Sequence, residues 1–194
     1  MRNTDYTTNK EYMNNAKTLD DIAAVRRSIR KYDGSKDVSR EELETIIRFA
    51  QEAPSWKNQQ TSRYHVVCNP DIIAKLRECL GGTNPQKTEG TKALIVTTFR
   101  RNIVGFNREG VPDNEVGNGW GFYDLGLQNA YLLLKAAEEG LDTLVIGIRE
   151  EPSIRALLNI PEDETIAAVI AVGHRAEEPQ RPPRKELEKI ATFY

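Results

Sequence analysis

Four basic side chains and one hydroxyl occur together near the start of the chain, in residues 26–31 (RRSIRK). In an extended backbone, alternate side chains point to opposite sides, so Arg26, Ser28 and Arg30 would point one way and Arg27 the other. Guanidinium groups and a hydroxyl that surround one anion are suited to binding a phosphate. An ordinary solvent-exposed basic face is the alternative interpretation, because basic runs are common on protein surfaces.

A second polar cluster, residues 53–60 (APSWKNQQ), follows directly after a predicted helix. Its side-chain amides and its hydroxyl could bind the edge of a planar heterocycle, and the indole of Trp56 could pack on the ring. The alternative interpretation of this cluster is a polar connecting loop without a ligand.

Residues that usually carry catalysis by themselves are scarce in this chain. His65 and His174 are the only histidines, and each lies beside a run of β-branched residues, so we expect structural roles for both. Cys68 and Cys79 form neither a CxxC pair nor a zinc knuckle, and we expect two reduced core thiols. No HExxH or GxSxG motif occurs. The sequence therefore predicts no metal site and no catalytic side chain, and any chemistry would be carried by a bound group.

The common nucleotide-binding motifs are also absent. Gly105 and Gly110 have the spacing of a phosphate-binding loop, but Val111 and Pro112 follow where that loop needs Lys and Ser or Thr. A dinucleotide-binding fingerprint comes directly after a strand, but no predicted strand precedes the glycines at 117, 119 and 121. Neither a kinase nor a Rossmann-type site is supported.

Composition narrows the class of protein further. The 194 residues include 27 Lys plus Arg and 29 Asp plus Glu, for a net charge of -2. This balance argues against nucleic acid as a partner. No apolar run approaches the roughly 18 residues that span a bilayer, and residues 1–17 lack the apolar core of a signal peptide, so we expect a cytoplasmic protein without a membrane partner. Residues 1–17 are polar and are expected to form a flexible N-terminal arm before one domain at 18–194.

Local signals define most of the helices and strands. Thr18 with Asp21 and Ser39 with Glu42 are capping boxes, and Asn69 before Pro70 is a third helix start. A long apolar helix is predicted over 120–139 and a glycine-rich loop over 100–119. Strands are predicted at 64–68, 93–99, 143–148 and 165–172. Because helices and strands do not alternate regularly, the pattern favours an α+β fold.

The two polar clusters, in this order and at this separation, resemble the FMN-dependent nitroreductase family. The family begins with an RRSIRxF-like element, here RRSIRKY, and continues after a capped helix with an APSxxNxQ-like element, here APSWKNQQ. The strand ending VIGI, the LLNIP turn, the strand ending VGH and the tail PRK also resemble the family. The likeness covers about residues 20 to 190. It implies a mixed, mainly antiparallel sheet flanked by helices, in a homodimer.

The resemblance also implies which residues hold non-covalent FMN. Arg26, Arg27, Ser28 and Arg30 would bind the phosphate, the ribityl chain and the pyrimidine side of the ring, and Arg184 with Lys185 would close on the phosphate. The other subunit of the dimer would contribute the loop that contains its APSWKNQQ segment. The remaining candidates for cofactor contact are Pro54, Ser55, Asn58 and Gln60 in that loop, Asn84 and Lys87 before the second strand, and Gly147 and Ile148 along the ring edge that includes N5.

Three aromatic residues are candidates for substrate contact: Phe106, Trp120 and Phe122. The nicotinamide and then the acceptor would stack in turn on one face of the flavin, and these aromatic rings would contact them there. For Trp120 and Phe122, core packing at the start of a buried helix is the alternative.

The activity that the resemblance implies is electron transfer from NADH or NADPH to nitro compounds, quinones or a related small acceptor, by a ping-pong mechanism. A flavin performs hydride transfer by itself, which agrees with the lack of an acid, base or nucleophile motif. Two alternatives remain. One is a flavin enzyme of the same fold that acts as a flavin reductase, dehalogenase or ring oxidase. The other is a non-catalytic flavin or ligand sensor. Thr61 after Gln60, where the family commonly has proline, and Gly147, where some members have an acidic residue, bear on the substrate preference.

Overall fold

The computed structural model describes residues 18–194, so the predicted N-terminal arm lies outside the described residues. The chain divides into two compact units, each assembled from separate segments. Unit 1 contains the segments up to Arg26, Ser39–Ser62 and Phe99–Leu141. Unit 2 contains Arg27–Val38, Arg63–Thr98 and the chain from Asp142 onward. The division into an arm and one domain remains a prediction.

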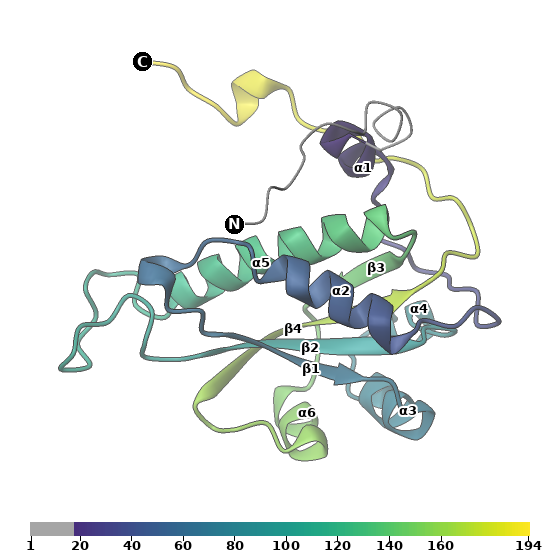
Figure 1. Ribbon diagram of the computed structural model, residues 1–194, viewed down its shortest axis with the longest axis horizontal. Helices are drawn as coiled ribbons and strands as arrows, with labels where there is room; N and C mark the ends of the chain where they lie inside the picture. Colours follow the sequence, from purple (N-terminus) through teal and green to yellow (C-terminus); the bar gives the residue numbers. More distant parts are fainter. Residues whose placement is uncertain (1–17) are drawn as a thin grey trace, which may run out of the picture. The chain divides into compact units, whose positions relative to one another are not determined.

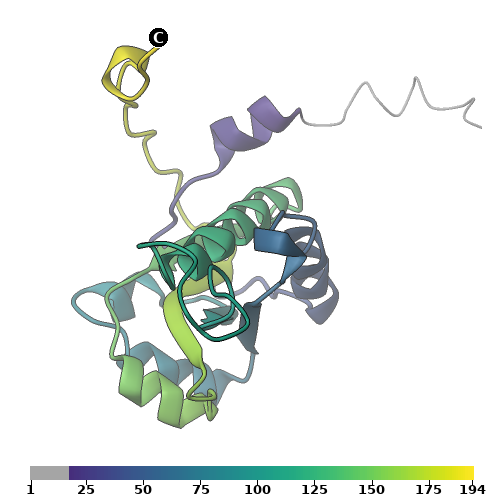
Figure 2. The same ribbon diagram turned by 90° about the vertical axis from the view of Figure 1, so that its left-hand side faces the viewer.

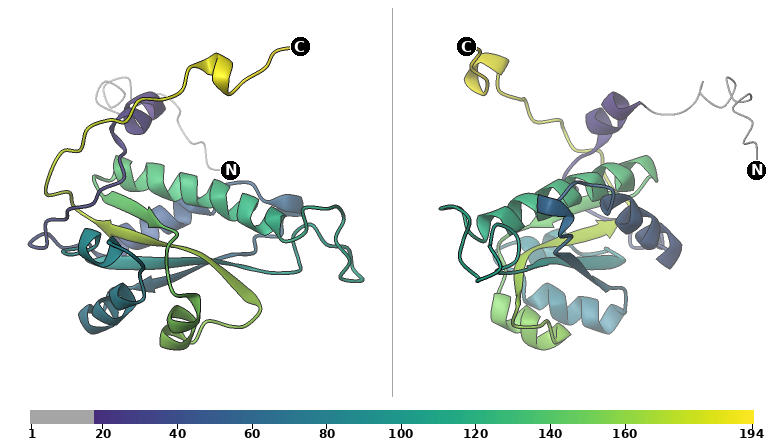
Figure 3. Two further views of the ribbon diagram at one scale, coloured as in Figure 1. Left: turned by 180° about the vertical axis from the view of Figure 1, so that it is seen from behind. Right: turned by 60° about the vertical axis from the view of Figure 1, so that its left-hand side comes forward.

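Unit 1 is helical. It contains α1 (Leu19–Val25), α2 (Arg40–Ala50), a 3-10 helix η2 (Trp56–Asn58) and the long α5 (Gly119–Glu138), with α2 packed against α5. The capping boxes predicted at Thr18 and Ser39 are both present, with each hydroxyl accepting the N–H of the third helical residue. These caps satisfy N–H groups that the helix itself leaves unpaired. Figure 3 shows the long loop that precedes α5.

Unit 2 is built on a four-stranded sheet in the order β1-β2-β4-β3 (Figure 1). The strands are β1 (Ser62–Val67), β2 (Ala93–Arg100), β3 (Asp142–Ile146) and β4 (Glu164–Gly173), of which Ser62 and the last two residues of β2 are counted in unit 1. β3 pairs antiparallel with β4, from Asp142 opposite Gly173 to Ile146 opposite Val169. β2 and β4 occupy the centre, and β2 is buried along its length except at Arg100. Such burial explains its near-continuous apolar sequence.

Helices of unit 2 cover one face of this sheet. α3 (Pro70–Glu78) and α6 (Glu151–Leu158) lie side by side there (Figures 1 and 3). Their apolar faces join a core with β2 and β4 that includes Leu76, Ile154 and Leu94. The short α4 (Asn84–Lys87) follows α3, and a 3-10 helix η3 (Leu187–Lys189) lies in the C-terminal tail (Figure 2). The predicted α+β class is confirmed.

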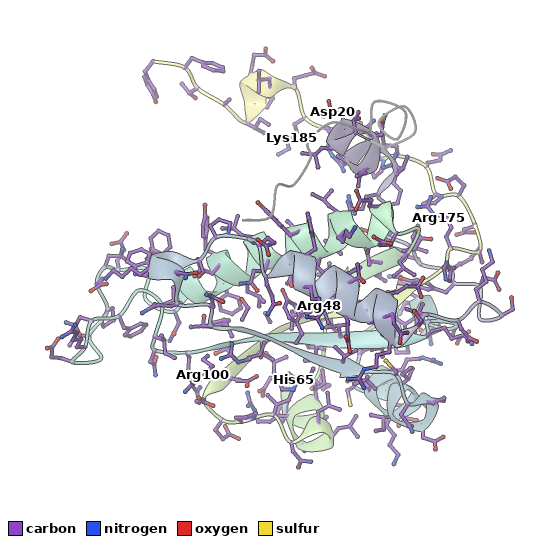
Figure 4. All side chains as sticks on the ribbon, viewed as in Figure 1. Asp20, Arg48, His65, Arg100, Arg175 and Lys185 are labelled. Carbon is purple, nitrogen blue, oxygen red and sulfur yellow. The ribbon has the colours of Figure 1, made fainter. Side chains whose placement is uncertain are left out.

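Several local predictions need correction. Cys68 is exposed and only Cys79 is partly buried, so Cys68 is not a core thiol, although neither cysteine is in a disulfide with a described residue. β3 ends at Ile146, which leaves Gly147 and Ile148 beyond the strand. Both histidines are satisfied as expected: His65 Nε2 lies 2.8 Å from Glu164 Oε2, and His174 Nε2 lies 3.1 Å from the Asp37 carbonyl (His65 is labelled in Figure 4). Among residues 18–194 no helix is long and apolar enough to span a membrane.

Candidate functional site

The basic segment that opens the candidate site forms an extended edge in unit 2. The Ile29 N–H donates to the Thr143 carbonyl at 3.0 Å, and Ser28 pairs in parallel with Thr143 of β3. Ile29 is fully buried, whereas its neighbours Ser28 and Arg30 are exposed. The predicted alternation of an extended strand is therefore present for these residues. Arg26 is the C-cap of α1 and belongs to unit 1, and Arg27 is half-buried.

A partly buried ion pair adjoins this segment. Tyr32 pairs with Arg175 in an antiparallel bridge, and the Arg175 guanidinium binds the buried Asp142 carboxylate at 2.9 Å through Nε and 2.7 Å through Nη2. These hydrogen bonds raise the pKa of Arg175 above its ordinary value. Figure 4 labels Arg175 just after β4. The pair connects the start of β3 with the end of β4, beside the basic segment.

Arg30 and Lys87 line the same pocket, which has a volume of about 500 Å³ and lies within unit 2. The lining is Arg30, Lys31, Tyr32, Thr83, Gln86, Lys87, Glu89 and Ala176. Its volume is in the range of small-molecule and cofactor sites. Three of these side chains are cationic and one is anionic. Lys31 is engaged by Glu177 at 2.7 Å, whereas neither Arg30 nor Lys87 forms an ion pair with a described residue. The pocket therefore offers two cations for an anionic ligand.

The segments before α4 and after β3 are hydrogen-bonded to each other. The Gly81 N–H donates to the Ile148 carbonyl at 2.9 Å, and the Asn84 side-chain amide reaches the same oxygen at 3.4 Å. A Cβ at Gly81 would lie 2.6 Å from Ile148 Cγ2, so a larger residue there would force the Ile148 side chain to shift. Gly147 and Ile148 are both exposed. Because α4 runs from Asn84 to Lys87, it connects this contact with the basic pocket.

In unit 1 the loop 54–60 has a strained backbone. Lys57, Asn58 and Gln60 have φ values of 48°, 55° and 49°, in the left-handed region that non-glycine residues rarely occupy. Ser55 Oγ accepts the Gln60 N–H at 3.1 Å, and the Asn58 side chain accepts from the Gln60 amide at 3.0 Å. Strain of this kind gathers at functional sites, where the surroundings hold it in place. Pro54, Ser55, Asn58 and Gln60 are therefore brought together in one preorganised loop.

Aromatic rings connect this loop with α5. Trp56 and Trp120 have ring centroids 4.7 Å apart, and the Trp120 Nε1–H donates to Asn114 Oδ1 at 2.9 Å. Phe122 packs edge-on against the buried Phe99 at 4.8 Å but is 49% exposed. Phe106 is half-buried in the loop before α5. Trp120 and Phe122 each combine packing with exposed ring surface, so neither is a fully buried core residue.

Of the predicted cofactor residues, only Arg30 and Lys87 line the basic pocket. Arg184 and Lys185 lie on the exposed tail, and Arg184 Nη1 donates to the Pro182 carbonyl at 3.3 Å. Sequence reasoning missed Thr83 and Gln86 in the pocket, and Asp124, which accepts the Trp56 N–H. Within residues 18–194 no group of three His, Cys, Asp or Glu could hold a metal ion.

The fold thus combines a basic pocket on the sheet unit with a strained polar loop on the helical unit. The chain belongs to the Nitroreductase family, whose profile it matches over residues 23–174. This family consists of oxidoreductases.

Individual proteins agree with this assignment. The chain is 28% identical to the "FMN reductase [NAD(P)H]" of Bacillus subtilis, with 84% of this chain and 68% of the relative covered. It is similar to an "FMN-dependent Nitroreductase" from Clostridium difficile R20291, with a TM-score of 0.69, 25% identity, and coverage of 89% and 96%. A nitroreductase family protein from Streptococcus pneumoniae TIGR4 has a TM-score of 0.81 at 18% identity, with coverage of 91% and 100%, which is a likeness of fold.

Proposed function

We propose that this protein is an FMN-dependent oxidoreductase that takes electrons from NADH or NADPH and passes them to a nitro compound, a quinone or a related small acceptor. The observation that carries the proposal is the 500 Å³ pocket in which Arg30 and Lys87, distant in sequence, both present cationic side chains without an ion-pair partner among the described residues. The similarity to an FMN-dependent nitroreductase supports FMN as the ligand.

The residues of unit 2 fit FMN chemically. Arg30 and Lys87 would hold the anionic parts of the cofactor, with Arg27 and Ser28 on the adjoining extended segment. The exposed backbone at Gly147 and Ile148 would lie along the ring edge. Arg184 and Lys185 are proposed to reach the phosphate from the tail, which is exposed in a single chain. Bound FMN would supply hydride acceptance from the nicotinamide and electron transfer to the acceptor.

The chain's own residues would bind and orient the cofactor and the substrate. A cationic side chain beside the ring would favour the anionic reduced form by Coulomb attraction. The second subunit would supply Pro54, Ser55, Asn58 and Gln60, whose amide and hydroxyl groups are held in place by the loop's internal hydrogen bonds. Phe106, Trp120 and Phe122 are proposed to contact the substrate, because Trp120 packs on Trp56 of that loop and both Trp120 and Phe122 keep exposed ring surface.

A homodimer is part of this proposal. Within unit 1, α5 keeps partly exposed apolar side chains, and α1, α2 and α5 surround a mostly apolar groove of about 370 Å³ lined by Leu19, Ile22, Phe49, Tyr131, Leu134, Lys135 and Glu138. Partly exposed apolar helices of this kind are typical of subunit interfaces. We expect an obligate dimer that buries on the order of 2,000 Å² or more.

Sedimentation at low micromolar concentration tests the dimer. We expect a single dimeric species, and Leu134→Glu should dissociate it because a carboxylate would enter the apolar groove. Ile72→Glu is the matched control, since Ile72 is a partly exposed apolar residue on α3 in unit 2. A parent protein that is monomeric and retains FMN contradicts this part of the proposal.

Absorption and steady-state kinetics test the activity. The purified protein should carry a flavin spectrum, and denaturation should release FMN. With NADH or NADPH and a nitroaromatic or quinone acceptor, double-reciprocal plots should be parallel, because donor and acceptor would use one face of the ring in turn. Intersecting lines contradict the shared face, and bound FMN without turnover favours a sensor.

Flavin reduction is a second candidate activity, favoured by the similarity to an FMN reductase. It is distinguished by offering free FMN as the only acceptor. An FMN reductase should oxidise the nicotinamide at a rate that saturates with free FMN and exceeds the rate with nitroaromatics or quinones. A nitro- or quinone-reducing enzyme should show the reverse order.

A further inference from the structure

Asp124 is a buried carboxylate in the second turn of α5. It is 3% exposed, and its Oδ2 accepts the backbone N–H of Trp56 at 2.9 Å, from a residue 68 positions earlier in the chain. Burial raises its pKa, an effect that the Trp56 N–H opposes. No cation among the described residues pairs with it. A buried carboxylate without a cation is costly, which makes a purely packing role unfavourable at this position.

The hydrogen bond lies immediately before the strained part of the loop. Lys57, Asn58 and Gln60 are all in the left-handed region, and Trp56 is the residue that precedes them. Backbone strain persists only where neighbouring contacts fix it. The Trp56 indole also contacts Trp120, which is on the same helix as Asp124. Thus α5 holds Trp56 twice, through the amide and through the ring.

Lys57 gives the loop another attachment. Its Nζ lies 3.6 Å from Asp113 in the long loop before α5, but the Lys57 side chain is 65% exposed. Exposed ion pairs contribute little. Of the two carboxylates that contact the Trp56-Lys57 dipeptide, the buried Asp124 is therefore the one expected to fix the backbone.

We propose that Asp124 is a positioning residue. Its hydrogen bond fixes the Trp56 amide. It thereby fixes the conformation of the Pro54–Gln60 loop and the orientation of the Trp56 indole. The consequence for FMN rests on the proposed function, because that loop is where a second subunit would contact the cofactor. The consequence for the loop itself does not rest on it.

Circular dichroism of the flavin-free protein tests the loop. Two indoles 4.7 Å apart with planes inclined by 51° should give an exciton couplet. Asp124→Ala should lose most of this couplet, and Asp124→Asn should retain it, because the amide oxygen can still accept the Trp56 N–H. Trp120→Phe should abolish the couplet, which would assign the couplet to the Trp56–Trp120 pair. Ile46→Val, a small change in a buried residue of α2, controls for loss of stability.

Asp124→Leu is the second variant if alanine fails to fold, since leucine keeps the branched shape of the side chain and removes the acceptor. A folded Asp124→Ala or Asp124→Leu protein with the parent couplet overturns the proposal.

Flavin fluorescence titration tests the cofactor consequence. Asp124→Ala should weaken FMN binding roughly tenfold, as loss of one charge-assisted hydrogen bond would. Asp124→Asn and Ile46→Val should stay within about twofold of the parent by the same conversion. If Asp124→Ala loses the couplet but binds FMN with the affinity of the parent, the proposed effect of Asp124 on FMN binding is overturned. A parent that binds no FMN overturns the proposed function instead, while the couplet still decides whether Asp124 positions the loop.

Discussion

Replacing Arg30 with alanine should weaken FMN binding roughly 10- to 150-fold. Hydrogen bonds to charged groups contribute about 1.5–3 kcal/mol, which converts to that range of dissociation constants. Arg30 is exposed, lines the pocket with Lys87, and among residues 18–194 donates only to the Ser28 carbonyl at 3.1 Å. Its guanidinium is therefore available to a phosphate or to the anionic ring edge. Flavin fluorescence titration of the apoprotein measures the change.

Two further variants make this result specific. Arg30→Lys keeps the charge but loses the two-pronged geometry, so its affinity should lie between those of the parent and Arg30→Ala. Lys75→Ala removes one positive charge from the exposed surface of α3 in the same unit, and it should leave the affinity within about twofold. If Arg30→Ala binds FMN as tightly as the parent, Arg30 is not a cofactor residue.

The predicted helix starts depend on short-range chemistry, which explains why they are confirmed. Thr18, Ser39 and Asn69 accept N–H groups two or three residues ahead, so the signal and its partner lie within one turn. The extended form of the basic segment was similarly predictable, since the one apolar residue among polar neighbours, Ile29, is the one that becomes buried. The sequence thus predicts an extended segment here, but not its pairing with β3.

The parts that sequence reasoning missed depend on contacts between distant residues. Nothing near Asp124 indicates that its partner is the Trp56 amide, and nothing near Trp56 indicates that three non-glycine residues after it adopt positive φ. The four-residue α4 is too short to show a hydrophobic period, although it brings Lys87 beside Arg30. Family resemblance identified Lys87 as a candidate, but the structure was needed to find its neighbours.

The partly buried Asp142–Arg175 pair shows the same limit, because its partners lie 33 residues apart. Replacing Arg175 with methionine should lower the free energy of unfolding by about 2 kcal/mol, between the values for exposed and for buried ion pairs, because a quarter of the Arg175 side chain is exposed. The Asp142 side chain is 10% exposed and would keep only the Arg175 backbone N–H at 2.7 Å. Methionine preserves most of the apolar stem of arginine, so the loss reports the charge. Denaturant unfolding measures it.

Lys31→Met is the matched control, because it removes a cation from the neighbouring Lys31–Glu177 pair, whose side chains are 69% and 49% exposed. Its cost should stay below about 1 kcal/mol, as for other exposed pairs. Asp142→Asn in the Arg175→Met background should recover part of the lost stability, because no unpaired charge is then buried. A cost for Arg175→Met as small as that for Lys31→Met would mean that the pair does not hold the ends of β3 and β4 together. The extended segment that carries Arg30 would then depend on its backbone hydrogen bonds to Thr143, His174 and Ala176.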